Sequence, residues 1–271
     1  MSRIAIVAGA GGLPAELAAA LTDSGEQAPM ICAPEGVAPD GLRVDLAFRV
    51  ERLAPFMRHL VDSGVGVVSF AGPVHRMALD PAVFDPETAT FVPRLVGAMQ
   101  GGDDATLRVV MELFEEYGLQ VQGLASLAPQ LLAGEGVLGE RPPDTSESAD
   151  AARGTAILQA LSPVDVGQGC VVADRLCLAV EALYGTDTML SQVAACRDSR
   201  APHKGGVFVK RAKAGQDLRV DLPAIGPATV RASQAARLTG ICLQAGHVVI
   251  LDRAETLAAA KAAGIALWAV P

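Results

Sequence analysis

The stretch RIAIVAGAGGLPAELAAAL, residues 3–21, combines a short apolar run, a glycine-rich turn and a helical pattern. Its first part, Arg3–Ala8, predicts a buried strand because it is apolar and ends at Gly9. Pro14 follows the turn at a position where a helix can begin without a backbone N–H, so a helix is expected over 14–21. A strand, a turn and a helix in this order are typical of an α/β protein.

The same alternation continues through the first half of the chain. Val65–Ala71 predicts the clearest strand there, and 103–117 predicts a strong helix with an acidic start. Further strands and helices are expected at 29–32, 53–61 and 118–122. Strands that alternate with helices favour a parallel sheet covered on both faces.

A polar stretch rich in Gly and Pro, residues 134–148, interrupts this pattern. Such a composition is typical of a linker, so we expect an N-terminal domain over 1–133 and a C-terminal domain over 149–271. The second domain is also α/β, with a hairpin around Asp174 and Arg175 that favours a mixed sheet. Its other elements are expected at 149–161, 186–195, 206–209, 239–243, 248–251, 254–263 and 264–270.

The charges are unevenly distributed in a chain of net charge −8. Residues 1–145 hold 9 basic and 19 acidic residues, whereas residues 146–271 hold 13 and 11. An acidic protein is a poor nucleic-acid binder, so no nucleic-acid partner is expected. The basic residues gather instead near 197–219, which suggests an anionic ligand. Five cysteines without a CxxC pair indicate a reducing cytoplasm, and no apolar run is long enough to span a membrane.

The glycine turn is the first candidate ligand site. Its backbone N–H groups lie at the positive end of a helix dipole, where a phosphate or a nucleobase can approach closely. The dinucleotide fingerprint is incomplete because Pro14 replaces its third glycine, so no NAD is expected. A turn with a purely packing role is the alternative. The candidate substrate-binding residues here are Gly9, Gly11, Gly12 and Leu13.

Two further candidates lie at the ends of the first-half elements. Ala71, Gly72 and Arg76 follow the strong strand, where ligands bind in open α/β sheets. Asp103 and Asp104 open the next helix and could bind ribose hydroxyls. A surface loop without a ligand and a simple helix cap are the respective alternatives.

In the second half, polar residues cluster around an apolar strand. Glu181 ends this strand, and a carboxylate in such a place needs a partner. Thr186 and Asp187 follow one turn later, so Glu181 and Asp187 could reach a common point; Gln168 lies just upstream. An ion pair of Glu181 with a nearby arginine is the alternative.

The densest cluster spans residues 210–229. Asp217, Arg219 and Asp221 alternate with apolar residues, which predicts an extended segment with these three on one face. Cations interleaved with carboxylates suit a phosphate and Mg²⁺ better than hydride transfer. A charged, exposed strand is the alternative. The other candidate residues of this cluster are Lys210, Lys213, Gln216 and Thr229.

Six stretches together resemble the UDP-2,3-diacylglucosamine pyrophosphatase family of lipid A biosynthesis, in its Rossmann-like two-domain type. They are VAGAGGLP (7–14), FAGPVHR (70–76), GDDATLR (102–108), DVGQGCVV (165–172), LAVEALYGTDTML (178–190) and residues 210–229. The resemblance implies Mg²⁺-dependent hydrolysis of UDP-2,3-diacylglucosamine to UMP and 2,3-diacylglucosamine 1-phosphate, or lipid X. It also implies a homodimer. Because this substrate is a lipid and the chain has no membrane-spanning run, we expect a cytoplasmic protein in peripheral contact with the inner membrane.

The resemblance also suggests roles for individual residues. Asp221 falls on the family's critical aspartate, which would bind the metal or activate water. Tyr184 stands where relatives tend to carry an acid, and Met77 where they tend to carry proline. An NAD(P)-dependent oxidoreductase and a non-catalytic nucleotide- or lipid-binding protein are the competing functions. The remaining metal-ligand candidates are Asp217, Asp187 and Glu181, and the expected charge-stabilising residues are Lys210, Lys213 and Arg219.

Overall fold

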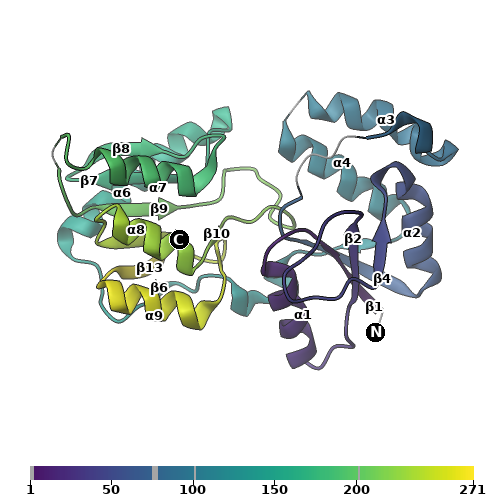
Figure 1. The fold of residues 1–271 in the computed structure, drawn as a ribbon, viewed down its shortest axis with the longest axis horizontal. Helices are drawn as coiled ribbons and strands as arrows, with labels where there is room; N and C mark the ends of the chain where they lie inside the picture. The colour runs from purple at the N-terminus through teal and green to yellow at the C-terminus, as the bar shows by residue number, and fades with distance from the viewer. Residues whose placement is uncertain (1–2, 75–78, 101, 201) are drawn as a thin grey trace. The chain divides into compact units, whose positions relative to one another are not determined.

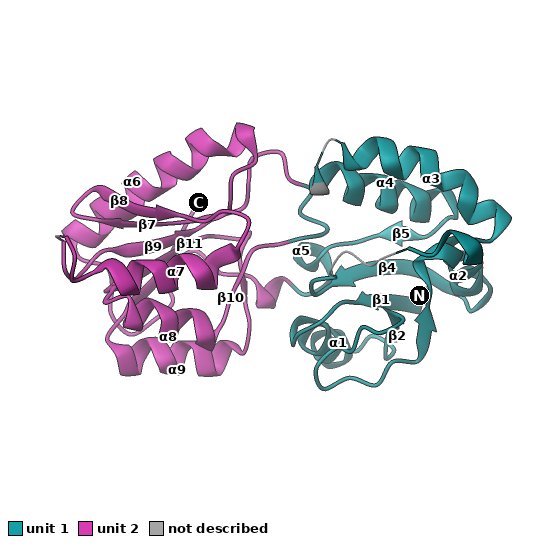
Figure 2. Ribbon diagram, turned by 45° about the horizontal axis from the view of Figure 1, so that its top comes forward, with its two compact units in different colours: residues 1–128, 217–221 teal, residues 129–216, 222–271 magenta. Residues whose placement is uncertain are grey.

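The computed structural model describes residues 3–74, 79–100, 102–200 and 202–271. The chain forms two compact units, drawn in different colours in Figure 2. Unit 1 comprises residues 1–128 together with 217–221, and unit 2 comprises residues 129–216 and 222–271. A five-residue segment from late in the sequence therefore belongs to the first unit.

Unit 1 contains a fully parallel five-stranded sheet in the order β3-β2-β1-β4-β5. Helix α1 packs on β1 and β4, α2 on β4, and α4 on β5 (Figure 1). The strands are β1 (Arg3–Ala8), β2 (Met30–Pro34), β3 (Leu46–Phe48), β4 (Val65–Ala71) and β5 (Gln120–Val121). The α-helices are α1 (Leu13–Asp23), α2 (Leu53–Asp62), α3 (Pro86–Met99), α4 (Asp103–Glu116) and α5 (Leu124–Leu127), with short 3-10 turns η1 (Val50–Arg52) and η2 (Pro81–Val83).

Aromatic rings fill much of the core of unit 1. Phe48 stacks on Phe56 with ring centroids 3.9 Å apart, and the Phe114 ring lies edge-on to Phe56 and Phe70. Val220 joins this core with only 4% of its surface exposed. Val220 therefore anchors segment 217–221 in the core of unit 1, although the rest of the segment is half-exposed or exposed.

Unit 2 contains a mixed six-stranded sheet in the order β6-β13-β11-β9-β7-β8, and β10 pairs with β12 in a separate parallel ladder. Strands β9, β11 and β13 are parallel to one another, whereas β6, β7 and β8 are antiparallel to their neighbours. The strands are β6 (Gly136–Val137), β7 (Gly169–Ala173), β8 (Leu176–Val180), β9 (Val207–Lys210), β10 (Ala224–Ile225), β11 (Gly240–Gln244), β12 (Val249–Ile250) and β13 (Ala266–Val270). The helices are α6 (Thr145–Leu161), α7 (Gly185–Cys196), α8 (Pro227–Ala235) and α9 (Arg253–Ala263), with η3 (Pro129–Leu131) and η4 (Ser162–Val164).

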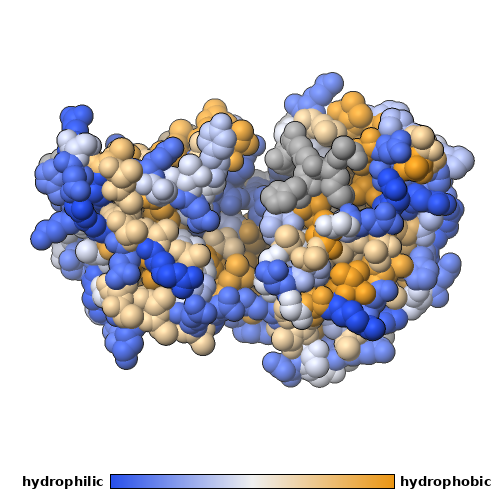
Figure 3. Space-filling view, in the orientation of Figure 1, coloured by the Kyte–Doolittle hydropathy of each residue, from blue (hydrophilic) through white to orange (hydrophobic). Residues whose placement is uncertain are grey.

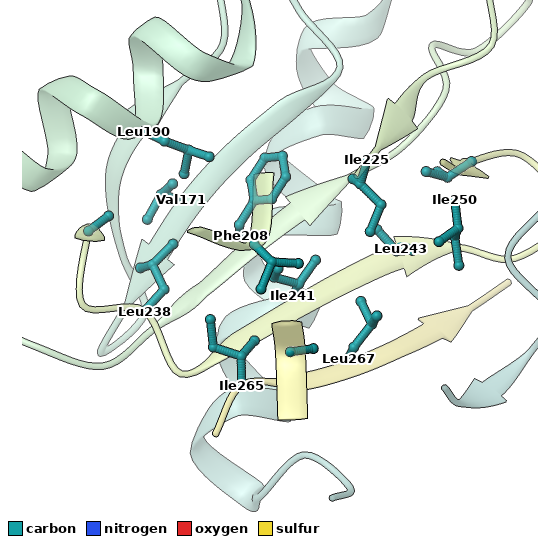
Figure 4. Close-up of a cluster of buried hydrophobic side chains, with 14 of the residues drawn as sticks. Val171, Leu190, Phe208, Ile225, Leu238, Ile241, Leu243, Ile250, Ile265 and Leu267 are labelled. Carbon is teal, nitrogen blue, oxygen red and sulfur yellow. The ribbon is translucent and has the colours of Figure 1, made fainter. Parts of the chain in front are cut away.

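The core of unit 2 joins residues from helices and from the middle of the sheet. Figure 4 shows Phe208 of β9 and Ile241 of β11 within this cluster, with Leu190 of α7 beside them. The expected hairpin is present, since β7 and β8 pair across Asp174 and Arg175, which both have positive φ. The α/β fold class and the mixed second sheet are thus confirmed.

Residues 134–148, predicted to be a linker, are structured parts of unit 2. They include β6, which pairs with β13, and the first turn of α6. Asp144 caps α6 by accepting a hydrogen bond from the Glu147 N–H, and Glu147 in turn is paired with Arg141. The Gly and Pro content of this stretch reflects turns between short elements. No helix among the described residues combines the length and apolar composition needed to cross a membrane.

Candidate functional site

The glycine turn lies at the point of the unit 1 sheet where the strand order reverses. The carboxyl ends of β1 and β4 meet there, and the Gly9 N–H donates to the Ala71 carbonyl over 2.7 Å. A Cβ on Gly9 would lie 2.3 Å from the Gly72 carbonyl oxygen. Gly9 and Gly72 therefore have a packing role in holding the two strand ends together. Ligands bind at this kind of position in open α/β sheets.

The next two glycines leave open space at the N-terminus of α1. Within the described part of the chain, and apart from the adjoining residues, no heavy atom lies within 4 Å of the Cβ position of Gly11 or Gly12. Leu13 begins α1, and no side chain of the described residues makes a capping hydrogen bond to this helix end. The first backbone N–H groups of a helix carry partial positive charge, so this end suits an anionic or hydrogen-bond-accepting group of a ligand.

Two predicted residues of unit 1 lie outside what the structure describes. They are Arg76 and the side chain of Asp103. Asp104 is described, and its carboxylate contacts two elements. Its carboxylate accepts from Arg108 Nε over 2.9 Å and from the Asp217 N–H over 3.3 Å. Asp104 therefore connects the start of α4 to segment 217–221.

Segment 217–221 is a turn, and the prediction of an extended strand is wrong. The Asp217 carboxylate accepts from the Arg219 backbone N–H over 3.0 Å, and the Val220 N–H donates to the Asp217 carbonyl. Asp side chains close turns in this way by bonding to the backbone two residues on. Asp217, Arg219 and Asp221 consequently do not line up on one face of a strand.

The charges of Asp217 and Arg219 satisfy each other. Two guanidinium nitrogens of Arg219 donate to the Asp217 carboxylate, at 2.7 and 3.0 Å, and a third donates to Glu115 over 2.6 Å. Hydrogen bonds from Arg219 hold the pKa of Asp217 below its ordinary value, and the same pairing raises the pKa of Arg219. Arg219 is thus paired with two carboxylates of its own unit, those of Asp217 and Glu115.

Asp221 is the exposed end of this turn. Its backbone is left-handed, with φ of 53°, a conformation that Asp tolerates better than most residues. Such a backbone conformation is sparsely populated and persists only where the surrounding structure holds it. Residues held in this way are common at functional sites.

In unit 2, the buried Lys210 and the half-buried Glu181 and Thr186 form a polar triad. Lys210 ends β9 with 4% of its surface exposed, and its Nζ donates to Glu181 Oε2 over 2.8 Å and to Thr186 Oγ1 over 2.7 Å. Thr186 Oγ1 also donates to Glu181 over 3.0 Å. The predicted ion pair of Glu181 exists, but its partner is a lysine. Asp187 lies beside the triad in sequence, in the first turn of α7.

The loop after β9 carries the other predicted residues of unit 2. Lys213 Nζ donates to Asp165 over 2.6 Å, with 26% of the lysine side chain and 60% of the aspartate side chain exposed. Gln216 accepts from Gln168 Nε2 over 3.0 Å and from the Lys213 N–H. Thr229 is buried and accepts from the Gly226 N–H at the start of α8, so the structure assigns it a helix-capping contact.

The four candidate metal ligands divide between the units, with Asp217 and Asp221 in unit 1 and Glu181 and Asp187 in unit 2. Among the described residues, no three His, Cys, Asp or Glu side chains are grouped so as to hold a metal ion. Glu181 and Asp217 are each paired with a cation. The residues therefore do not form an all-protein cage. They fit the other mode of Mg²⁺ binding, in which one exposed carboxylate acts together with substrate phosphates.

Two residues that contact segment 217–221 were absent from the sequence-based site. Glu115 lies on α4 and accepts a hydrogen bond from Arg219. Gly123 directly precedes α5, and a Cβ on it would lie only 2.6 Å from Arg219 Cα. Both lie about a hundred positions from their partners in the chain. No local pattern in the sequence marks either of them.

Both halves of the chain are similar to one protein family. The LpxI N-terminal domain family matches residues 3–131, and the LpxI C-terminal domain family matches residues 134–268. A UDP-2,3-diacylglucosamine pyrophosphatase LpxI from Caulobacter vibrioides is 34% identical over 269 residues, which cover 98% of this chain and 96% of the relative.

Proposed function

This chain belongs to the LpxI family, and from that premise we propose that it hydrolyses the pyrophosphate of UDP-2,3-diacylglucosamine. The observation that carries the proposal is the 34% identity to a pyrophosphatase of that name over 98% of the chain. The protein is accordingly an enzyme, a hydrolase of lipid A biosynthesis, rather than an oxidoreductase or a non-catalytic binding protein.

The reaction adds one water molecule across the P–O–P bridge. The water oxygen bonds to one phosphorus while the bridging P–O bond breaks, and the released oxygen takes up a proton. The products are UMP and 2,3-diacylglucosamine 1-phosphate. Asp221 is the residue proposed to orient or deprotonate the attacking water, since it is an exposed carboxylate that directly follows the buried Val220.

Mg²⁺ is the proposed cofactor, and Asp221 is the carboxylate that would hold it. When bound, Mg²⁺ would withdraw charge from the non-bridging oxygens of the pyrophosphate. Asp217 and Glu181 are weaker candidates than the sequence suggested, whereas the exposed Asp187 stays a candidate. The first two already accept hydrogen bonds from Arg219 and Lys210.

The cations are proposed to have different tasks. Lys213 is partly exposed, and exposed ion pairs such as Lys213–Asp165 contribute little, so its ammonium can exchange Asp165 for a substrate phosphate. Lys210 is buried, so we assign it to orienting Thr186 and the first turn of α7. In unit 1, the open N-terminus of α1 would accept a polar group of the substrate.

The proposal is tested by incubating the protein with UDP-2,3-diacylglucosamine and measuring UMP, with Mg²⁺ or with EDTA. We expect UMP with Mg²⁺, and a loss of at least about 100-fold in kcat in the Asp221→Asn variant, as for loss of one oriented catalytic group. Asn also tolerates a left-handed backbone, so the unfolding temperature should stay near that of the parent protein. Undiminished UMP release in EDTA would refute the requirement for Mg²⁺. An Asp221→Asn variant with the parent activity would refute the role of Asp221.

Peripheral contact with a lipid surface is a second part of the proposal. Leu183 and Tyr184 are 93% and 79% exposed, and they lie in the sequence between Glu181 and Thr186 of the polar triad. On the face shown in Figure 3, hydrophobic residues reach the surface in patches among hydrophilic ones. Exposed apolar side chains next to a candidate site are typical of proteins that contact lipid.

Co-sedimentation with vesicles of phosphatidylethanolamine and phosphatidylglycerol tests this contact. We expect Leu183→Ser/Tyr184→Ser to bind less than the parent protein, and Leu176→Ser, at an exposed apolar residue of β8, to bind as the parent does. Equal binding by all three proteins would overturn the assignment of Leu183 and Tyr184. The expected homodimer rests on the family resemblance, and equilibrium sedimentation would test it.

A further inference from the structure

We propose that Glu115 and Gly123 are positioning residues for Asp221, acting through segment 217–221. Both lie in the first 128 residues, far from Asp221 in the sequence, and neither is assigned a role by the proposed catalytic chemistry. The inference rests on the proposed function, since it assumes that Asp221 acts in hydrolysis. It concerns contacts within unit 1 alone.

The first support is a chain of charged contacts that leads from α4 to the turn. Glu115 accepts from one terminal nitrogen of Arg219, at 2.6 Å, and the rest of the guanidinium is held by Asp217. The backbone N–H of Asp217 in turn donates to the carboxylate of Asp104, at the start of α4. Charge-assisted and bidentate hydrogen bonds of this kind fix the orientation of the guanidinium, although the half-exposed Arg219–Glu115 pair adds little stability. Two positions of α4 thus clamp one side of the turn.

The second support is a backbone contact on the other side of the turn. A Cβ on Gly123 would lie 2.6 Å from Arg219 Cα, 3.0 Å from the Leu218 carbonyl oxygen and 3.2 Å from Arg219 C. Real Cβ atoms do not approach backbone so closely, so only glycine permits this packing. Val220, the residue after Arg219, is buried in the aromatic core of unit 1.

Together these contacts fix the backbone immediately before Asp221. Arg219 is held through its side chain and its Cα, Val220 is held by the core, and Asp221 then emerges exposed with φ of 53°. A shift of the turn would carry the Asp221 carboxylate with it. Since a misplacement of about 1 Å can cost about 100-fold in rate, small changes at Glu115 or Gly123 should reach the chemistry.

A steric variant tests the backbone contact without changing any charge. We expect Gly123→Ala to lower kcat for UMP release by about tenfold or more, with KM within about twofold, because the turn moves while the substrate contacts of the parent remain. Gly97→Ala is the matched control, since a Cβ at Gly97 on α3 meets no atom of the described residues within 4 Å outside its own helix turn. A Gly123→Ala variant with the parent kcat would overturn the proposal.

A charge variant tests the other clamp. We expect Glu115→Gln to lower kcat, whereas Glu112→Gln should not, although Glu112 lies on the same helix and pairs with Arg94 over 2.7 Å. A merely structural role would predict equal effects of Glu115→Gln in any background. We therefore measure Glu115→Gln again in an Asp221→Asn protein. Because positioning acts only through the Asp221 carboxylate, the second substitution should then change the residual kcat by less than about twofold.

The outcomes separate this inference from the proposed function. If the parent protein releases no UMP, or if Asp221→Asn is fully active, the proposed function fails. If Asp221→Asn is inactive but Glu115→Gln and Gly123→Ala keep the parent kcat, only the positioning role fails. If Glu115→Gln lowers kcat by the same factor with and without Asp221, its effect is structural and the positioning role is again refuted.

Discussion

Gly12, at the N-terminus of α1, distinguishes a packing role from a ligand-binding one. Its φ is −82°, which alanine adopts freely, and a Cβ there meets no heavy atom of the described residues within 4 Å, its sequence neighbours apart. We expect Gly12→Ala to leave the unfolding temperature unchanged or slightly higher, because alanine restricts the unfolded chain. If substrate occupies this space, KM should rise. Steady-state kinetics with thermal unfolding checks this, and an unchanged KM would exclude close substrate approach at Gly12.

The Lys210–Glu181 pair is the residue-scale test of stability in unit 2. Removing one partner of a buried pair leaves an uncompensated charge, so Glu181→Gln or Lys210→Met alone should destabilise the protein by about 3–5 kcal/mol. The double variant should recover part of that loss. Lys213→Met, which removes a partly exposed pair, should cost less than about 1 kcal/mol. Urea unfolding gives each value; additive losses in the double variant would contradict the coupling.

At the scale of elements, Glu51 links η1 to Asp80, the residue just before η2. Its carboxylate accepts from the Asp80 N–H over 2.9 Å and from Arg49, and these hydrogen bonds lower its pKa from 4.5 to about 2. Since the folded pKa lies below the unfolded one, the stabilisation is fully present above about pH 4.5 and is lost as pH falls towards about 2. We expect Glu51→Gln to flatten this part of the stability–pH curve. Urea unfolding at stepped pH measures it, and parallel curves would count against Glu51.

Elements whose signal is local could be predicted, and those that depend on distant partners could not. Arg3–Ala8 and Val65–Ala71 are strands with the predicted bounds, because apolar runs ended by glycine specify buried strands. Helix α3 was missed, since Pro86 and Pro93 weaken its pattern, although Asp85 caps it. Segment 217–221 has the alternation of a strand. Its turn is set by the Asp217 side chain and by Glu115, which lies 104 positions from its partner Arg219 in the sequence.

At the scale of the whole molecule, the assignment of segment 217–221 to unit 1 makes a direct prediction. Val220→Ala should lower the stability of unit 1 by about 1–2 kcal/mol, from the methyl groups lost from its core. Hydrogen exchange should then be faster in β1 and β4 and little changed in β9 and β11. Val230→Ala, in the core of unit 2, should give the reverse pattern. Faster exchange in unit 2 alone after Val220→Ala would contradict the assignment.

The chain passes between the units three times, after residues 128, 216 and 221. Neither unit is therefore encoded by one continuous stretch of gene. A chimaera that exchanged residues 1–128 for those of a relative would place the resident turn 217–221 against foreign residues at positions 115 and 123, unless residues 217–221 were exchanged as well. For the same reason, a protease that cut only at residue 128 would nick the protein without releasing either half.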